Sequence, residues 1–261
     1  MIDRNKMTPS YARPTTRVHV GKVPFDVATM SSAVGHVIEA AETRNPLPVR
    51  LSNAYCVALA SRDPNYAALL NGPGLNYPDG APVAWFMKAR NDAGIPLSRV
   101  RGPSFFSEVL AASSGHDLKH FFLGTTDETL ALLSDAIGSR FPDTKSAGSY
   151  APPFAPVTDS FLQDCEDRIR LVGADVVWVG LGTPKQDYVA AELAVRLGVP
   201  CIGVGAAFDF LAGTVPEAPK WVQRSGTEWF YRLVSEPRRL WKRYLFGNVR
   251  FLYSALAESG K

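Results

Sequence analysis

The segment DVVWVG at residues 175–180, followed by LGTPKQ at residues 181–186, decides the fold class. The first segment combines three valines and a tryptophan, which is typical of a buried β-strand. The second contains a glycine and a proline, which favour a tight turn, and the residues after it predict a helix over 184–197. A strand that passes through a glycine turn into a helix is the repeating unit of a parallel α/β sheet.

The same alternation extends in both directions from this unit. We expect further strands at 17–22, 48–53, 120–124, 145–150 and 200–204. We expect further helices at 29–43, 54–61, 64–70, 82–89, 104–112, 127–140 and 158–172, and helical structure from 219 onward. The run NGPGLNYPDG at 71–80 is rich in Gly, Pro and Asn, which predicts an irregular loop. Together these elements predict an α/β fold with a parallel sheet.

The composition is that of a folded chain of 261 residues, of which 46% are hydrophobic and 20% charged. This length allows one large domain, or one domain with an appendage. No apolar run reaches the roughly 18 residues of a membrane-spanning helix, and residues 1–16 are predicted to be a flexible leader. The three cysteines form no CxxC pair, which favours a reducing compartment. The net charge of +3 does not suggest nucleic acid as a partner.

The positive charge is concentrated in the last part of the chain. Residues 216–261 contain nine basic and four acidic residues, a net charge of +5, which leaves −2 for the remainder. The aromatic residues interleaved with them are Trp221, Trp229, Phe230, Tyr231, Trp241, Tyr244, Phe246, Phe251 and Tyr253. This pattern is typical of an interfacial helix, whose rings lie at headgroup depth while its cations meet anionic lipid. The alternative is a helical hairpin docked on the core, with these rings packed inside.

Three polar or glycine-rich stretches follow predicted strands, at the edge where open α/β sheets bind ligands. They are SN at 52–53, GLGTPKQ at 180–186 and GVGAAFD at 203–209, and they supply Asn53, Gly182, Gln186, Gly205 and Asp209. The 180–186 stretch either binds a phosphate on the free N–H groups of a helix start or is a simple tight turn. It lacks the third glycine of a dinucleotide fingerprint, which counts against an NAD-dependent enzyme.

Asp79 lies in a Pro-Asp-Gly sequence within the predicted loop. A carboxylate there can act as a general base if its pKa is raised toward neutrality, or it can stabilise a turn by bonding its own backbone. Arg99 and Arg101 precede a predicted helix, and their guanidinium groups suit either diphosphate oxygens or solvent. His116 and His120 have no third metal ligand nearby and are expected on the surface, so no metal site is predicted.

The order of these pieces along the chain is more specific than any one of them. Asn53, PDG at 78–80, RVRG at 99–102, GTPKQ at 182–186 and GVGAAFDFLAG at 203–213 occur in that order. They are followed by APKWVQ at 218–223, EWFYRL at 228–233 and EPRRLWKRY at 236–244. Together they resemble the WecG/TagA/CpsF family of bacterial glycosyltransferases, over roughly residues 17–255.

The resemblance implies a Rossmann-like α/β core at 17–215, with helices on both faces, and a C-terminal helical, basic-aromatic, membrane-associating appendage at 216–261. It implies an inverting, metal-independent reaction without a cofactor. The sugar would pass from a UDP-sugar to a sugar carried on undecaprenyl diphosphate, in exopolysaccharide, capsule or cell-wall polymer synthesis. It places the protein in the cytoplasm, peripheral on the inner face of the bacterial plasma membrane, and it implies self-association.

Matched position by position, the resemblance makes Asp79 the general base and Asn53, Arg99 and Gln186 residues of the substrate cleft. Gly182, Gly205 and Asp209 complete the predicted cleft. Appendage arginines would fold over the donor diphosphate; they are Arg232, Arg239 and Arg243, with Arg238 and Lys242 as alternatives to the last two. Without a divalent metal, arginines and helix N-termini must meet the negative charge of the leaving UDP.

Four positions depart from the pattern of the family. They are Leu51 in place of a threonine, Ser104 of an aspartate, Asp187 of a glutamate and Glu217 of an arginine. None of these changes removes the predicted base, but they leave the donor sugar open. The alternative to an enzyme is a non-catalytic nucleotide-sugar-binding component of a polysaccharide assembly complex.

Overall fold

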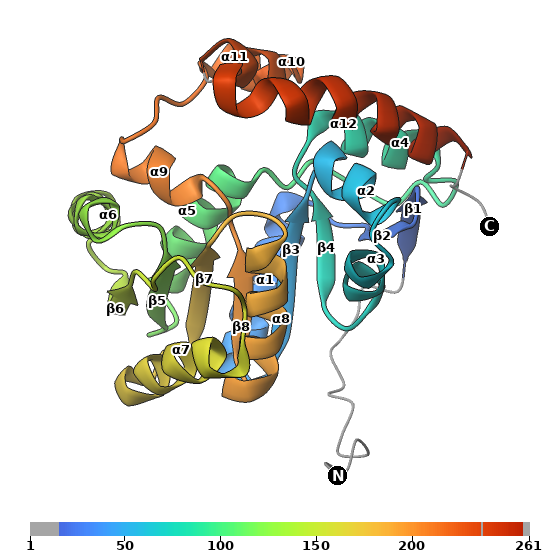
Figure 1. Ribbon diagram of the computed structural model, residues 1–261. Helices are drawn as coiled ribbons and strands as arrows, with labels where there is room; N and C mark the ends of the chain where they lie inside the picture. Colours follow the sequence, from blue (N-terminus) through green and yellow to red (C-terminus); the bar gives the residue numbers. More distant parts are fainter. Residues whose placement is uncertain (1–15, 236, 258–261) are drawn as a thin grey trace.

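The computed structural model describes residues 16–235 and 237–257, apart from the side chains of residues 224, 232, 235, 237–240 and 242–246. Nearly all of the predicted leader, residues 1–15, lies outside the described residues. Within the described part, six strands form one parallel sheet in the order β4-β3-β8-β7-β5-β6 (Figure 1). They are β3 (Leu47–Ser52), β4 (Leu75–Pro78), β5 (Lys119–Gly124), β6 (Lys145–Tyr150), β7 (Val176–Gly180) and β8 (Pro200–Gly203).

Helices cover both faces of this sheet, because successive side chains of a strand point to opposite faces. Trp178 of β7 packs with one group of helices, whereas its neighbours Val177 and Val179 pack with the other. The first group is α1 (Met30–Glu42), α5 (Gly102–Ser113), α6 (Asp127–Arg140) and α9 (Ala207–Ala212). The second group is α7 (Asp159–Val172) and α8 (Lys185–Leu197). The predicted α/β fold is confirmed.

Threonine side chains begin three of these helices. Thr29, Thr126 and Thr158 each accept a hydrogen bond from the backbone N–H three residues further on, at 3.1, 3.3 and 3.2 Å. A capping hydroxyl satisfies a donor that the first helical turn cannot pair internally. α7 and α8 end before Gly173 and Gly198, which adopt the left-handed conformation that glycine tolerates best. These signals fix where each helix meets the sheet.

The strand predicted at 17–22 is confirmed over residues 17–20, but a second strand follows it that was not predicted. The chain forms a hairpin, with β1 (Arg17–Val20) and β2 (Val23–Asp26) joined by a turn at Gly21 and Lys22. Gly21 has a φ of +60°. A Cβ atom built on it would lie 2.3 Å from Ser254 Oγ, so only glycine fits between the hairpin and the last described helix.

The prediction that 71–80 is irregular throughout is wrong. β4 pairs in parallel with β3, from Val49 opposite Leu75 to Ser52 opposite Pro78. Asn76 in β4 is buried, but its side-chain amide donates to two backbone carbonyls at 2.6 and 2.9 Å. The sheet tolerates a proline here because β4 is its edge strand. Asp79, the next residue, therefore follows the carboxyl end of a strand.

His120 is buried, contrary to the expectation that it lies on the surface. It is the second residue of β5, and its Nδ1 atom accepts a hydrogen bond from Trp178 Nε1 at 3.0 Å. Burial lowers the pKa of His120 to about 4, so the ring is neutral at physiological pH. This histidine contributes to core packing.

The appendage consists of α10 (Lys220–Ser225), α11 (Glu228–Ser235) and α12 (Pro237–Ala257). In Figure 1, α12 crosses the molecule beside α2 (Ala54–Ala60) and α4 (Ala81–Ala89). Phe251 and Ala255 of α12 are buried in a cluster with the hairpin, α2, α3 (Pro64–Asn71) and α4. The ring of Phe251 meets the ring of Phe86 edge-on, with centroids 5.5 Å apart.

The docked alternative is confirmed for part of the appendage only. One end of α12 is docked on the core, whereas Trp221, Trp229, Phe230 and Trp241 are exposed. None of the helices in the described ranges combines the length and hydropathy needed to span a bilayer.

Candidate active site

The carboxyl ends of β3 and β4 bring Asn53 and Asp79 together. The backbone N–H of Asp79 donates to Ser52 O at 3.0 Å, which ties the Pro-Asp-Gly segment to the end of β3. A Cβ atom on Gly80 would lie 3.3 Å from Asn53 Cβ. Asn53 begins α2, because its Oδ1 atom accepts a hydrogen bond from Tyr55 N at 3.0 Å. This helix cap holds the asparagine beside the predicted base.

Asp79 does not form the simple turn that its sequence context allows. Its Oδ1 atom accepts a hydrogen bond from the backbone N–H of Gly102, the first residue of α5, at 2.8 Å. Burial raises the pKa of Asp79, and the nearby Glu228 carboxylate adds to this. The Gly102 N–H and the guanidinium groups of Arg99 and Arg101 act in the opposite direction. The resulting pKa lies above the ordinary value for an aspartate, which suits a general base.

A second contact joins the stretches that follow β7 and β8. Gln186 is buried in the first turn of α8, and its Oε1 atom accepts a hydrogen bond from Gly205 N at 3.0 Å. The Gln186 N–H donates to Gly182 O at 2.9 Å. Gly182 and Gly205 have φ values of +76° and +56°, which allow these sharp changes of direction. Gln186 thus holds the two stretches together.

The ends of β3 and β4 and the stretch after β8 approach one another at Gly102. A Cβ atom built there would lie 3.4 Å from Leu51 Cδ1, 3.6 Å from Val204 O and 3.7 Å from Asp79 Oδ1. Asp79 and the stretch that begins with Gly205 therefore border the same region at the carboxyl edge of the sheet. Leu51 contributes an apolar side chain, rather than a hydroxyl, to this region.

Asp187 is a further polar residue near this edge that sequence reasoning noted only as a departure. It is buried, and its Oδ2 atom accepts a hydrogen bond from Tyr66 OH at 2.7 Å. Its carboxylate also bonds the side chain of Gln186. Burial raises the pKa of Asp187 to about 6, although both hydrogen bonds and the charge of Arg50 lower it. Asp187 acts on the site through Gln186, which in turn holds Gly205.

Replacing Asp187 with asparagine is expected to change how stability depends on pH. The folded protein binds the Asp187 proton more tightly than the unfolded chain, whose ordinary pKa is 3.8. Protonation of Asp187 therefore stabilises the folded protein fully below about pH 4, and this stabilisation is lost as the pH rises through about 6. Relative to Asp187→Asn, the wild-type protein should lose about 3 kcal/mol of unfolding free energy between about pH 4 and pH 7. Urea unfolding at several pH values measures this, and parallel curves for the two proteins would contradict it.

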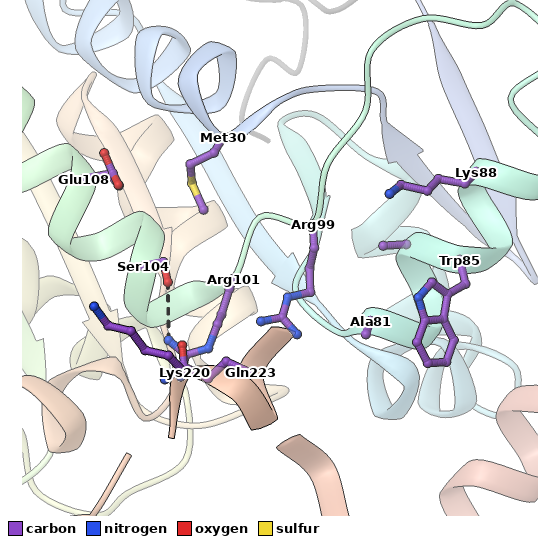
Figure 2. Close-up of a pocket in the computed structure, with 11 residues that line it drawn as sticks. Met30, Ala81, Trp85, Lys88, Arg99, Arg101, Ser104, Glu108, Lys220 and Gln223 are labelled. Atoms are coloured by element: carbon purple, nitrogen blue, oxygen red, sulfur yellow. Dashed lines mark hydrogen bonds between the residues drawn. The ribbon is translucent and has the colours of Figure 1, made fainter. Parts of the chain in front are cut away.

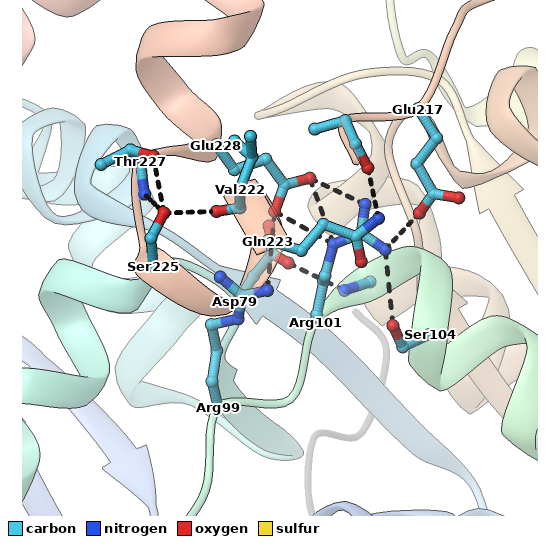
Figure 3. Close-up of polar contacts among 12 residues, drawn as sticks. Asp79, Arg99, Arg101, Ser104, Glu217, Val222, Gln223, Ser225, Thr227 and Glu228 are labelled. Carbon is cyan, nitrogen blue, oxygen red and sulfur yellow. Dashed lines mark hydrogen bonds and ion pairs between the residues drawn. The ribbon is translucent and has the colours of Figure 1, made fainter. Parts of the chain in front are cut away.

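Arg101 connects this region to the appendage (Figure 3). Its side chain is only 5% exposed, and its guanidinium group binds both carboxylate oxygens of Glu228 at 2.7–3.1 Å. The Nη1 atom lies 2.6 Å from Glu217 Oε1 and 3.4 Å from Ser104 Oγ. Arg99 also reaches Glu228, at 3.5 Å. Ser104 and Glu217, two of the positions that depart from the family pattern, therefore both contact the buried Arg101.

A cavity of about 650 Å³ lies beside this cluster, between α4, α5 and α10 (Figure 2). Lys88, Arg99, Arg101 and Lys220 line it, together with Glu108 and the exposed Trp85. Asn53, Asp79 and Gln186 are not among its lining residues. Sequence reasoning missed Lys88 and Lys220, since a lysine on a helix surface carries no signal of its own.

The remaining predicted site residues lie elsewhere or outside the description. Asp209 is in α9, where its backbone oxygen accepts a hydrogen bond from Thr214 N at 3.0 Å, and it does not line the cavity. Arg232 lies in α11, and Arg239 and Arg243 lie in α12, but their side chains are outside the described residues. Their roles stay predictions. No group of three His, Cys, Asp or Glu side chains arranged to hold a metal occurs in the part of the chain that the structure describes.

Comparison with known proteins shows the family to which the chain belongs. Residues 18–261 match the model of the family described as "Glycosyl transferase WecG/TagA/CpsF family". The chain belongs to the WecG/TagA/CpsF glycosyltransferase family. One relative, from Bacillus subtilis, is an N-acetylglucosaminyldiphosphoundecaprenol N-acetyl-beta-D-mannosaminyltransferase, 30% identical over 190 residues, which are 71% of this chain and 70% of the relative. A relative of the same name from Bacillus spizizenii is 29% identical over 191 residues, with coverage of 71% and 70%.

Membership in the WecG/TagA/CpsF family makes this protein a glycosyltransferase, so the NAD-dependent enzyme and the non-catalytic binding component are set aside. The match includes the appendage as well as the α/β core. The Arg101 cluster therefore joins two parts of the chain that both lie within the family match.

Proposed function

We propose that this WecG/TagA/CpsF enzyme transfers a sugar from a UDP-sugar to a sugar linked through diphosphate to undecaprenol, with inversion at the anomeric carbon and without a divalent metal. The observation that carries this proposal is the position of Asp79. It lies at the carboxyl edge of the sheet, held by the N-terminus of α5, with a raised pKa. The names of the two relatives make an N-acetylmannosamine donor and an N-acetylglucosamine acceptor the first pair to test.

In the proposed reaction, Asp79 removes the proton from an acceptor hydroxyl. The hydroxyl oxygen then forms a bond to the anomeric carbon of the donor, and the bond from that carbon to the UDP oxygen breaks with its electron pair. Because Oδ1 of Asp79 accepts a hydrogen bond from the Gly102 N–H, we assign the proton transfer to Oδ2. A proton taken in this way contributes rate enhancements of about 10²–10⁴-fold in enzymes.

The leaving UDP gains negative charge on its diphosphate, which cationic groups and helix N-termini must stabilise. We assign this role to the N–H groups of Gly182, Thr183 and Lys185 in the turn after β7, to Arg99 and to the appendage arginines Arg232, Arg239 and Arg243. Guanidinium groups suit the task because each donates two parallel hydrogen bonds to phosphate oxygens. The metal independence of the reaction rests on this supply of fixed positive charge.

The function is tested by incubating the full-length protein with UDP-sugars and an undecaprenyl-diphosphate-linked N-acetylglucosamine, and following UDP release and product mass. The expected product is a disaccharide of inverted configuration on the lipid, formed equally with a chelator and with added magnesium. Product formed only with magnesium would overturn the metal-independent mechanism. Release of UDP without any lipid-linked product would overturn the proposed acceptor.

We also propose that the exposed aromatic residues of the appendage bind the surface of an anionic membrane. Trp221 in α10 is 72% exposed, and Trp241 in α12 is 45% exposed. Trp229 and Phe230 of α11 are exposed as well, with ring centroids 5.8 Å apart. The net charge of +5 on residues 216–261 supplies the attraction to anionic lipid. A peripheral position on the inner face of the bacterial plasma membrane follows, whereas self-association stays a prediction.

Replacing Trp221 and Trp241 with serine is expected to weaken binding to phosphatidylglycerol vesicles by at least about tenfold, since each indole loses its burial in the headgroup region. Leu132→Ser, which removes an exposed apolar side chain from α6, is the control and should bind as the wild type does. Vesicle sedimentation measures both. Equal binding by the tryptophan variant, or equal binding of the wild type to neutral vesicles, would contradict the proposal.

A further inference from the structure

The cavity bordered by Ala81, Arg99 and Arg101 contains two lysines, Lys88 and Lys220, that the proposed donor site does not use. Four of its lining side chains are cationic and one, Glu108, is acidic. Arg101 is already paired with Glu217 and Glu228. Lys88 and Lys220 are exposed, and no ion pair to them occurs among the described residues. The cavity thus presents positive charge that the described part of the protein does not neutralise.

We propose that this cavity binds the diphosphate of the lipid-linked acceptor, with Lys88 and Lys220 as the residues that contact its phosphate oxygens. The inference rests on the proposed function, because it takes Asp79 as the base. Figure 2 shows Lys88 and Lys220 at opposite ends of the cavity. An ammonium group is a compact point charge on a flexible chain, so each lysine can turn toward a diphosphate held between them.

The position of the cavity relative to Asp79 supports this assignment. Its wall includes Ala81, two residues after Asp79, and Arg99 and Arg101, from the loop that precedes Gly102. Figure 2 shows the Arg99 side chain lying between Ala81 and the Arg101 side of the cavity. In an acceptor whose first sugar is attached directly to the diphosphate, the reacting hydroxyl and the diphosphate lie on the same pyranose ring. With that hydroxyl at Asp79, the diphosphate is placed in the adjoining cavity.

The donor contacts at the ends of β7 and β8 do not line the cavity, whereas Arg99 does. The Gly102 position that holds Asp79 is also close to Val204 O, and Gly205 follows directly and is bonded to Gln186. Gln186 and Gly205 do not line the cavity. The two diphosphates are thereby assigned to different residues: Lys88 and Lys220 for the acceptor, and the turn after β7, Arg99 and the appendage arginines for the donor.

The open side of the cavity leads to the proposed membrane surface. Trp85 lines the cavity and is 56% exposed, and Lys220 is followed by the exposed Trp221. Gly226 packs on the ring of Trp85, since a Cβ atom there would lie 2.7 Å from it. The appendage therefore forms one wall of the cavity, and a prenyl chain attached to a diphosphate held there can leave along these rings toward lipid.

The test is steady-state kinetics of full-length Lys88→Gln/Lys220→Gln, with farnesyl-diphosphate-linked N-acetylglucosamine as a soluble acceptor and the UDP-sugar that the wild type uses. We expect the KM for the acceptor to rise at least about tenfold, because two charge-assisted contacts are lost. The KM for the UDP-sugar and the kcat at saturating acceptor should stay within about twofold. With an acceptor that carries an octyl group in place of the diphosphate lipid, the variant and the wild type should not differ.

Lys119→Gln is the matched control, since this exposed lysine begins β5, at the end of the strands that lies away from Asp79. It should behave as the wild type toward both substrates. An unchanged acceptor KM in the double variant, or a rise confined to the UDP-sugar, would overturn the assignment of the cavity. Failure of the proposed function is distinguishable, because the wild-type protein would then form no product with either acceptor.

Discussion

Asp79→Asn is expected to lower kcat by about 10³-fold, because asparagine cannot take the proton of the acceptor hydroxyl. The side-chain oxygen of the introduced amide can still accept the hydrogen bond from Gly102 N that holds Asp79 at 2.8 Å, so α5 should begin as before. UDP affinity, measured by calorimetric titration, should stay within about twofold. Rates of UDP release with the lipid acceptor provide the kinetic measurement.

The pH profile gives a second readout of the same prediction. A base must be deprotonated to act, so kcat/KM of the wild type should fall as the pH drops through the pKa of Asp79, which burial raises above the ordinary value. This acid limb should be absent from the residual activity of Asp79→Asn. Asp135→Asn, on the exposed face of α6, is the control and should keep full activity and the acid limb. Transfer by Asp79→Asn at the wild-type rate would contradict the role of Asp79.

Arg101→Gln is expected to loosen the appendage and to reduce kcat/KM by at least about tenfold, since the Glu228 carboxylate then lacks its main partner. Arg101 is buried and binds Glu228 with two of its nitrogens, so the pair differs from an ordinary surface ion pair. In a double-mutant cycle with Glu228→Gln, the coupling energy should be about 2–3 kcal/mol. Urea unfolding of the four proteins measures it.

The two single variants should move the acid limb of the pH profile in opposite directions. Glu228 raises the pKa of Asp79 and Arg101 lowers it, so Glu228→Gln should shift the limb to lower pH and Arg101→Gln to higher pH. Arg44→Gln, which breaks the exposed pair with Asp175, is the control and should cost less than about 1 kcal/mol. Shifts in the same direction, or a coupling no larger than that of the control pair, would contradict the electrostatic link.

Local signals were sufficient to predict most of the fold. The valine-rich strand at 176–180 and the glycine turn after it each act within a few residues, so a sequence window contains the whole cause. β4 was missed because Pro78 and the glycines on either side of the strand indicate a turn, whereas pairing with β3 outweighs that preference. The hairpin turn at Gly21 was missed for a related reason, since its neighbour Ser254 lies far along the chain.

Some residues of the candidate site could likewise be predicted from the local sequence, whereas others could not. Asp79, Asn53 and Gln186 follow strand ends, and the carboxyl edge of a parallel sheet collects such residues whatever their partners are. Arg101 could not be distinguished from a solvated arginine, because its acidic partners lie in the appendage, more than a hundred residues later. Lys88 and Lys220 form one cavity only because α4 and α10 face each other in space.

The β1–β2 hairpin and the end of α12 cover one another, with Ser254 against Gly21 and Phe251 and Ala255 in the same buried cluster as the hairpin valines. During synthesis, the hairpin leaves the ribosome long before these helical residues do. The helices α2, α3 and α4 can cover part of its apolar side early, but the part that α12 covers must remain open until residue 255 has left the ribosome. Stalled or shortened chains will therefore expose that part of the first strands to aggregation.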